Sequence, residues 1–174
     1  MESRMVSNVL PLDSAGVIRR NWRLGLRLVF ALFWLADAVL KWRLILDNVD
    51  YSDVIVRGAA GQPGWLMCWI NYWASIAKQT PGFPYLIATV ETIIALFLLA
   101  GLLTNWVSLS GIIISFLVWS TAEAFGGIFV AGATDIGASP LYMAMFAGLI
   151  VVQAGRDRGL DAILSKRYPR IPLI

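Results

Sequence analysis

Residues 85–103 read YLIATVETIIALFLLAGLL, and only one charged side chain, Glu91, interrupts this apolar run. A helix needs about 20 predominantly apolar residues to cross a bilayer. Similar stretches run from about Leu24 to Trp42, from about Trp106 to Glu123 and from about Ile136 to Val152. The sequence therefore predicts an all-α integral membrane protein built as a four-helix bundle.

The composition favours the same class. The chain has 174 residues, of which 59% are hydrophobic and 14% are charged. Soluble domains average roughly 45–50% apolar and about 25% charged residues. A water-soluble fold of this size cannot hide so much apolar surface. The net charge of +3 is too small to indicate nucleic acid as a partner, and we expect membrane lipid instead.

Two residue counts exclude several kinds of site. The chain has no histidine, which excludes histidine-ligated haem and Ser-His-Asp catalysis. Its one cysteine, Cys68, cannot form an intrachain disulfide or hold an iron–sulfur cluster. We therefore expect no haem, no iron–sulfur cluster and no metal in this chain. Among apolar neighbours, Cys68 is expected to be buried as a small hydrophobic residue, and the alternative is a sulfur acceptor.

Lysine and arginine placement predicts the orientation. Ten basic and four acidic residues lie in or beside the two terminal segments, whereas four basic and seven acidic residues lie on the other side. Excess Lys and Arg marks the cytoplasmic side. We expect a multi-pass protein of the plasma membrane with both termini cytoplasmic. Residues 1–23 would form a basic N-terminal segment, 24–154 the transmembrane domain and 155–174 a basic tail, with a tight hairpin at Thr104-Asn105.

A fifth helix is predicted between the first and second spans. The residues that recur with helical spacing are Trp65, Trp69, Tyr72, Trp73 and Ile76. This segment is short for a span, and Trp and Tyr are typical of the membrane interface. We expect an amphipathic interfacial helix. It either only anchors the protein or forms a lid or partner-docking surface beside a site.

Ionisable residues gather near the outer ends of the predicted spans, namely Asp37, Lys41, Glu91, Glu123 and Asp135. Such groups cost at least ~2.5–3.5 kcal/mol in the bilayer, so they usually pair or serve a function. Asp37 and Lys41 are spaced i, i+4 and either neutralise each other or present Lys41 to an anion or a quinone oxygen. Glu91 either is protonated or pairs with Lys41. Glu123 lies closer to the interface, where simple solvation is the alternative.

Several segments together resemble a known family. They are FWLADAVLKW at 33–42, GQPGW at 61–65, ETIIAL at 91–96, WSTAEAFGG at 119–127 and GATDIG at 132–137. The chain resembles the DoxD family, the small membrane subunit of thiosulfate:quinone oxidoreductase, within the wider DoxX-like four-helix membrane proteins. The resemblance implies an enzyme subunit that oxidises thiosulfate to tetrathionate, passes the electrons to a membrane quinone, and works with a DoxA-like partner subunit.

Chemistry suggests roles for individual residues in such a protein. A cluster of Lys41, Glu91, Glu123 and Asp37 would supply hydrogen bonds and protons to quinone oxygens. The residues expected to bind the quinone are Trp34, Trp42 and Trp119, which would flank its flat ring, and Asp135. The outer side carries a net negative charge, which would repel a thiosulfate dianion. Thiosulfate would therefore need Arg43, Arg57 or the partner subunit.

Two other functions stay open. The first is an accessory or assembly subunit of a terminal quinol oxidase complex, without an active site of its own. The second, without support from the resemblance, is a small proton-coupled transporter that uses the buried acids. The missing discontinuous helices argue mildly against a transporter.

Overall fold

The computed structural model describes residues 14–156 and 158–167, and that part of the chain is all-helical, as predicted. The four helices of the bundle are α1 (Ser14–Leu46), α4 (Phe83–Ala100), α5 (Thr104–Ser120) and α6 (Ser139–Val151). The remaining elements are α2 (Tyr51–Val56), η1 (Arg57–Ala59), α3 (Gly64–Gln79), η2 (Ala124–Gly127) and α7 (Leu160–Arg167). The predicted terminal basic residues Arg4 and Arg170 lie outside the described residues.

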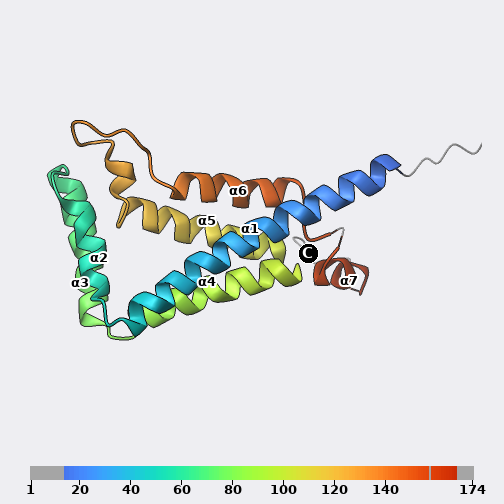
Figure 1. Ribbon diagram of the computed structural model, residues 1–174, viewed down its shortest axis with the longest axis horizontal. Coiled ribbons are helices and arrows are strands. Elements are labelled where there is room, and N and C mark those ends of the chain that lie inside the picture. Colours follow the sequence, from blue (N-terminus) through green and yellow to red (C-terminus); the bar gives the residue numbers. More distant parts are fainter. Residues whose placement is uncertain (1–13, 157, 168–174) are drawn as a thin grey trace, which may run out of the picture.

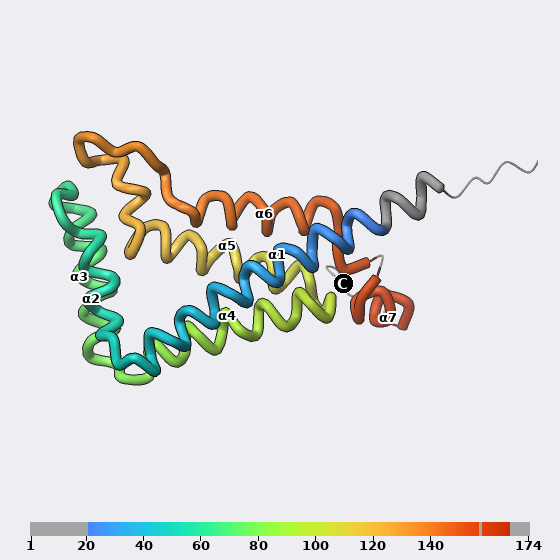
Figure 2. The backbone as a smooth tube through the Cα atoms, in the orientation of Figure 1, coloured from blue at the N-terminus to red at the C-terminus, as the bar shows by residue number. Residues whose placement is uncertain are grey.

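The bundle helices form two pairs, because α1 packs along α4 and α5 packs along α6. The pairs spread apart toward one end of the molecule, where α2 and α3 lie side by side across the opening (Figure 1). Helix α7 lies at the opposite end, as the backbone trace shows most clearly (Figure 2). We call the end with α2, α3 and residues 121–138 the loop end, and the end with α7 the tail end.

The connection between α4 and α5 is a sharp turn at the tail end. Gly101 adopts the left-handed conformation (φ 63°) that ends α4. The side chain of Asp161 accepts hydrogen bonds from the backbone N–H groups of Leu103 (2.6 Å) and Thr104 (2.8 Å), which caps the start of α5. The turn therefore lies at residues 101–103. The predicted tight hairpin is present, but its predicted position at Thr104-Asn105 is wrong, because both residues are already helical.

Aromatic packing forms the core between the pairs. The ring of Phe146 on α6 meets Phe30 (4.7 Å between ring centroids) and Trp34 (4.8 Å) on α1, each edge to face. Gly111 on α5 makes room for the Phe146 ring, since a Cβ atom at this position would collide with it. A small residue thus lets α5 approach α6 closely.

A second core lies at the loop end. Helix α3 forms where an amphipathic helix is predicted, and it packs through Leu66, Ile70, Ala74 and Ala77. The aromatic residues Trp65, Trp69 and Tyr72 are exposed on another face of the helix. The tryptophans divide between the two faces: Trp69 is partly exposed but donates its indole N–H to the hydroxyl of Ser120 on α5 (3.2 Å), and Trp73 packs inward against Phe83. The packed face is built mainly from smaller residues that the predicted pattern did not include.

By length and composition together, α4 alone among the described helices could cross a membrane. Helices α5 and α6 are also apolar, but they have 17 and 13 residues. A helix of the length of α6 spans about 20 Å, against about 30 Å for the hydrocarbon core. The predicted fourth span is shortened because the chain before Ser139 is irregular. The number of spans and their orientation stay predictions.

Candidate functional site

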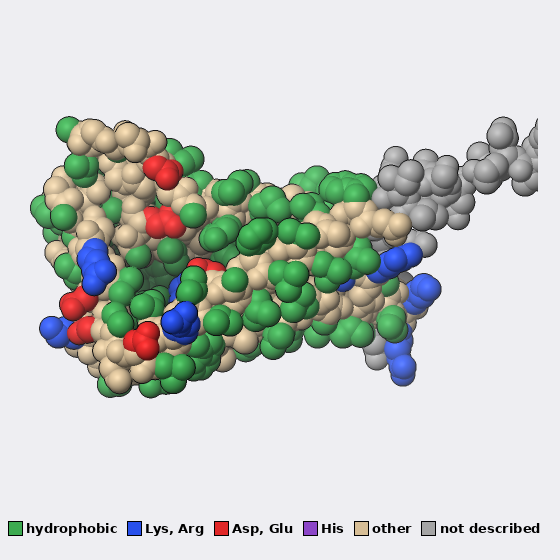
Figure 3. Space-filling view, in the orientation of Figure 1, with side chains coloured by type: hydrophobic (Ala, Val, Ile, Leu, Met, Phe, Trp, Pro, Cys, Tyr) green, Lys and Arg blue, Asp and Glu red, His purple; other side chains and the backbone are tan. Residues whose placement is uncertain are grey.

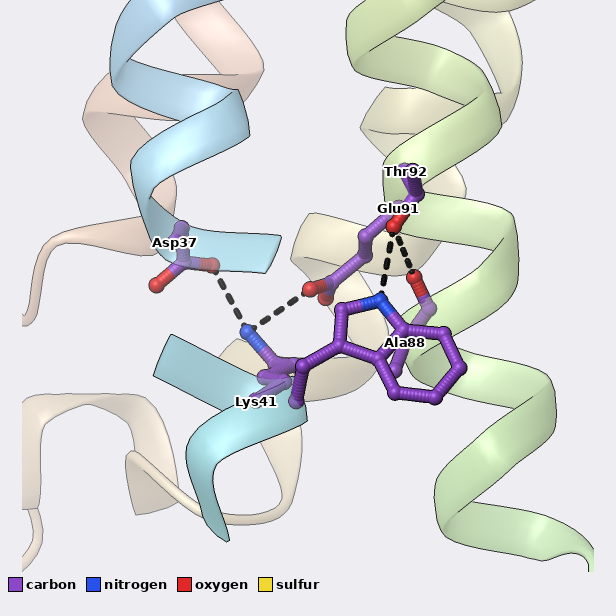
Figure 4. Close-up of polar contacts among 6 residues, drawn as sticks. Asp37, Lys41, Ala88, Glu91 and Thr92 are labelled. Carbon is purple, nitrogen blue, oxygen red and sulfur yellow. Dashed lines mark hydrogen bonds and ion pairs between the residues drawn. The ribbon is translucent and has the colours of Figure 1, made fainter. Parts of the chain in front are cut away.

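Lys41 lies at the centre of a charged cluster between α1 and α4. Its Nζ atom is 2.7 Å from Oδ2 of Asp37 and 2.9 Å from Oε2 of Glu91 (Figure 4). The side chain of Glu91 is 1% exposed, that of Lys41 15% and that of Asp37 32%. One ammonium group is thus shared by two carboxylates, and the cluster opens outward on the side of Asp37.

Neighbouring polar contacts hold the two helices in register around this cluster. Asp37 and Lys41 are one helical turn apart on α1 and face α4 together. The next residue, Trp42, donates its indole N–H to the hydroxyl of Thr92 on α4 (3.0 Å). Thr92 in turn donates to the carbonyl of Ala88 (2.7 Å). The side chain of Trp42 therefore joins α1 to α4 beside the ion pairs.

An apolar cavity of about 230 Å³ lies on the loop-end side of the cluster. Asp37 and Lys41 form its charged part, and residues of α2, α3, α4 and α5 complete it. Those remaining residues include Tyr51, Val54, Ile55, Trp73, Phe83, Ile87, Ile114, Leu117 and Val118. Small-molecule sites usually combine a largely apolar lining with a few polar groups that fix the ligand's orientation, and this cavity has that character.

Two further polar groups line the apolar cavity. Burial raises the pKa of Tyr51 to about 12; the negative charges of Glu91 and Asp37 add to this effect, and the positive charge of Lys41 opposes it. The phenol therefore keeps its proton at neutral pH and can donate a hydrogen bond. The indole N–H of Trp73 is buried and has no hydrogen-bond partner within the described part of the chain.

A second, polar cavity of about 130 Å³ lies between the four bundle helices. Its lining includes Asp37, Lys41, Glu91 and Glu123, so the four acid–base residues predicted from the sequence all face one space. The other lining residues are Trp34, Ser115, Val118, Ala138, Ser139 and Tyr142. Asp37, Lys41 and Val118 line both cavities, which places the charged cluster at their shared wall.

Glu123 reaches the polar cavity from the segment that follows α5. Its Oε2 atom accepts a hydrogen bond from the backbone N–H of Ser139 (3.2 Å) at the start of α6. Gly137 lies directly against this carboxylate and has a positive φ of 85°, so a larger residue would both collide and be strained. Glu123 thereby ties the end of α5 to the start of α6, and it makes no ion pair with Lys41 among the described contacts.

The remaining predicted site residues line neither the apolar nor the polar cavity. Trp119 donates its indole N–H to the carbonyl of Ile136 (2.7 Å), and Asp135 accepts from the backbone N–H of Gly137 (2.9 Å). Both hold the loop before α6 and line neither of the two cavities, and neither does Trp42. Arg43 is exposed and also lines neither. Arg57 lines an open groove at the loop end.

Four residues that line the cavities were not predicted from the sequence: Tyr51 and Trp73 in the apolar cavity, and Ser115 and Tyr142 in the polar cavity. A signal existed for Ser115, because Ser108, Gly111 and Ser115 follow one face of α5 and are all buried. Cys68 is exposed, so the expectation that it is buried is wrong: it lies off the packed face of α3. Among the described residues, no group of three or more His, Cys, Asp or Glu side chains is placed to hold a metal ion.

The fold and the site together define a helical-bundle protein with a buried charged cluster between two cavities. No family model matches the sequence, and neither a curated protein nor a solved structure does.

Proposed function

We propose that this chain is a membrane subunit of a thiosulfate:quinone oxidoreductase of the DoxD type. In this proposal the electrons come from the oxidation of thiosulfate to tetrathionate and pass to a membrane quinone. The quinone ring occupies the apolar cavity. The observation that carries the proposal is the placement of Lys41 and Asp37 at the wall of this otherwise largely apolar cavity.

The chemistry of the lining suits a quinone, which is a flat apolar ring with two carbonyl oxygens and takes up two electrons and two protons. The walls offer Trp73 and Phe83, whose ring centroids are 6.4 Å apart, for packing against such a ring. Lys41, Tyr51 and the indole N–H of Trp73 are donors for its oxygens. Glu91 lies behind Lys41 and is placed to return a proton to it.

A membrane setting is part of the proposal: four spans in the plasma membrane with both termini cytoplasmic. Support comes from large apolar side chains exposed along the bundle, such as Phe33, Leu96, Ile113 and Leu141. In Figure 3 hydrophobic side chains cover the middle of the visible face, and charged ones gather toward the ends. Single cysteines at Gly132 and Arg167, in a Cys68→Ser background, should be labelled from opposite sides of the membrane. Labelling from one side would contradict this topology.

The sulfur substrate is assigned to the loop end. Thiosulfate is a dianion, and Arg57 is the arginine that lines the open groove there. Glu123 lines the same groove, and its negative charge opposes an anion. We therefore assign part of the thiosulfate site to a DoxA-like partner subunit, which would dock at the loop end.

Quinone binding by the purified chain tests the proposal. The full-length protein in lipid nanodiscs is titrated with a short-chain quinone by equilibrium dialysis. Ile87→Trp fills the apolar cavity from α4 and should abolish binding, whereas Ile93→Trp adds the same side chain to the exposed face of α4 and should leave binding unchanged. No binding by the wild type, or equal binding by Ile87→Trp, would contradict the proposal.

The alternative is an accessory or assembly subunit of a terminal quinol oxidase complex. The observation that favours it is the exposed aromatic face of α3, formed by Trp65, Trp69 and Tyr72. Under this alternative, alanine substitutions on this face would lower the amount of assembled oxidase. Filling the apolar cavity with Ile87→Trp would then leave the activity per assembled complex unchanged.

A further inference from the structure

Glu123 lies between two hollows that otherwise share no charged residue. It lines the polar cavity inside the bundle, and it also lines the groove of about 370 Å³ at the loop end. The groove is formed by Arg57, Gln62 and the segment from Ala124 to Ala133, and it is open to the surroundings. Glu123 therefore lies between the loop-end surface and the interior.

The polar cavity contains donors that the protein leaves unpartnered. The indole N–H of Trp34 and the hydroxyl of Ser115 are buried, with 3% and 1% of these residues exposed, and neither has a hydrogen-bond partner within the described residues. Buried polar groups are almost always satisfied by protein or by ordered water. A cavity needs only about 10–15 Å³ to hold one water molecule, so this one has room for several.

The charges around the polar cavity favour protons over anions. Three carboxylates, those of Asp37, Glu91 and Glu123, face a single ammonium group, that of Lys41. The phenol of Tyr142 adds a neutral donor and acceptor at the same wall. An anion would meet net negative charge here, whereas water and a mobile proton would meet three carboxylates as acceptors.

The same cavity reaches the predicted quinone site. Asp37 and Lys41 line both the polar and the apolar cavity, and Lys41 is in direct contact with Glu91. Polar residues thus follow one another from the loop-end groove to Lys41: Glu123 lines both the groove and the polar cavity, and Glu91 lines the polar cavity in contact with Lys41. In Figure 4 the Lys41 ammonium group lies between the two carboxylates.

We propose that the polar cavity is a proton inlet: a short chain of water molecules that carries protons from Glu123 at the loop-end groove to the Glu91–Lys41 pair. The inference rests on the proposed function, because the protons are consumed at the quinone. Reduction of one quinone takes two electrons and two protons and forms two O–H bonds. Two thiosulfate ions supply the electrons, one each, and join through a new S–S bond as tetrathionate. Lys41 gives each proton to a quinone oxygen and regains one from Glu91.

Water access to the cavity is measured without turnover. Hydroxyl-radical footprinting of the full-length protein in nanodiscs, after rapid mixing with ¹⁸O-labelled water, reports which buried side chains meet exchanging water. We expect labelled oxidation of Trp34 and Tyr142 in the wild type. Ala138 is exposed at the cavity lining, and Ala138→Trp should plug the cavity and suppress that labelling. Ala144→Trp, on an exposed position of α6 outside the cavity, is the matched control.

Turnover then tests the proton role in the partner-bound protein. Glu123→Gln keeps an acceptor for the Ser139 N–H but cannot carry a proton. It should slow quinone reduction about 10²-fold, with the KM for quinone unchanged. Ala138→Trp should slow it similarly, and Ala144→Trp should have no effect.

The outcomes separate the inference from the function on which it rests. Normal quinone binding and normal turnover in both Glu123→Gln and Ala138→Trp would overturn the proton inlet and leave the quinone site standing. Unlabelled Trp34 and Tyr142 in the wild type would also overturn the inlet. A wild type that binds no quinone would overturn the proposed function and, with it, the proton role, even if water enters the cavity.

Discussion

Lys41 on α1 and Glu91 on α4 are joined by a 2.9 Å ion pair, and the side chain of Glu91 is 1% exposed. The two residues are 50 positions apart in the sequence, so this contact forms only when α1 packs along α4. A carboxylate buried so deeply is costly unless it is paired, and Lys41 is its partner. The ion pair therefore couples the packing of these two helices to the charge of the site.

Removing one partner of this pair should destabilise the protein more than removing both. Lys41→Met leaves Glu91 buried without a cation, which typically costs about 3–5 kcal/mol. In the double variant Lys41→Met/Glu91→Gln no buried carboxylate remains at this position, so part of the loss should be recovered. Thermal unfolding in detergent measures the difference. A double variant no more stable than Lys41→Met would contradict the assignment of Lys41 as the partner that holds Glu91.

The tail end should depend on Asp161, although it lies in a segment that the sequence presents as a polar tail. Its carboxylate caps α5 and lies near the buried Arg27, whose guanidinium donates to the carbonyls of Ala154 (3.0 Å) and Arg158 (2.6 Å). Asp161→Ala should lower stability by at least the about 0.5–2 kcal/mol of a lost cap. Asp53→Ala, at an exposed position of α2, serves as the control in the same unfolding measurement. Equal stability of the two variants would argue against the cap.

The phenol of Tyr51 should ionise only in strongly alkaline solution. Its pKa of about 12 lies above the ordinary value of 10.0, so its contribution to stability is complete below about pH 10 and is lost as the pH rises through about 12. The tyrosinate absorbance of the wild type minus that of Tyr51→Phe gives its titration directly. A difference midpoint near pH 10 would show that Tyr51 is not buried against the cluster. Circular dichroism at each pH checks that the helices persist.

The contact between Gly111 and Phe146 should tolerate no added methyl group. A Cβ atom on Gly111 would collide with the Phe146 ring, so Gly111→Ala should destabilise the bundle by about 1–3 kcal/mol through overpacking. Gly148 on α6 has open space around it, so Gly148→Ala is the matched control and should not destabilise. Combining Gly111→Ala with Phe146→Leu should recover part of the loss. A neutral Gly111→Ala would contradict close packing of α5 on α6.

The sequence predicted the helices well where apolar runs are long, and less well at their ends. The run around Glu91 gave α4 within a few residues, because its length and composition allow little else. The end of α4 depends on Gly101 and on the distant Asp161, and a local pattern cannot reveal a contact of that kind. The packed face of α3 was missed because large tryptophans dominate its pattern, whereas Leu66 and Ile70 pack.

The charged part of the site could be predicted from the sequence, because a buried charge is energetically costly. On that ground Asp37, Lys41, Glu91 and Glu123 were predicted as site residues, and all four line the polar cavity. The tryptophans predicted to flank the quinone ring were a less reliable guide to the site. Trp119, for example, is held in another position by its hydrogen bond to the Ile136 carbonyl. Tyr51 and the other residues of α2 and α3 line the apolar cavity only because the loop end folds over the bundle. The sequence pattern of these helices does not indicate that arrangement.

The most direct test of the central claim is thiosulfate-driven reduction of a soluble quinone analogue by the partner-bound protein, normalised to folded complex. Glu91→Gln preserves the shape of the side chain and leaves Lys41 paired with Asp37. It should lower the rate by about 10²–10⁴-fold, as expected for the loss of a positioned acid–base group. A wild-type rate in Glu91→Gln would contradict the account and leave the cluster as a structural feature of the bundle.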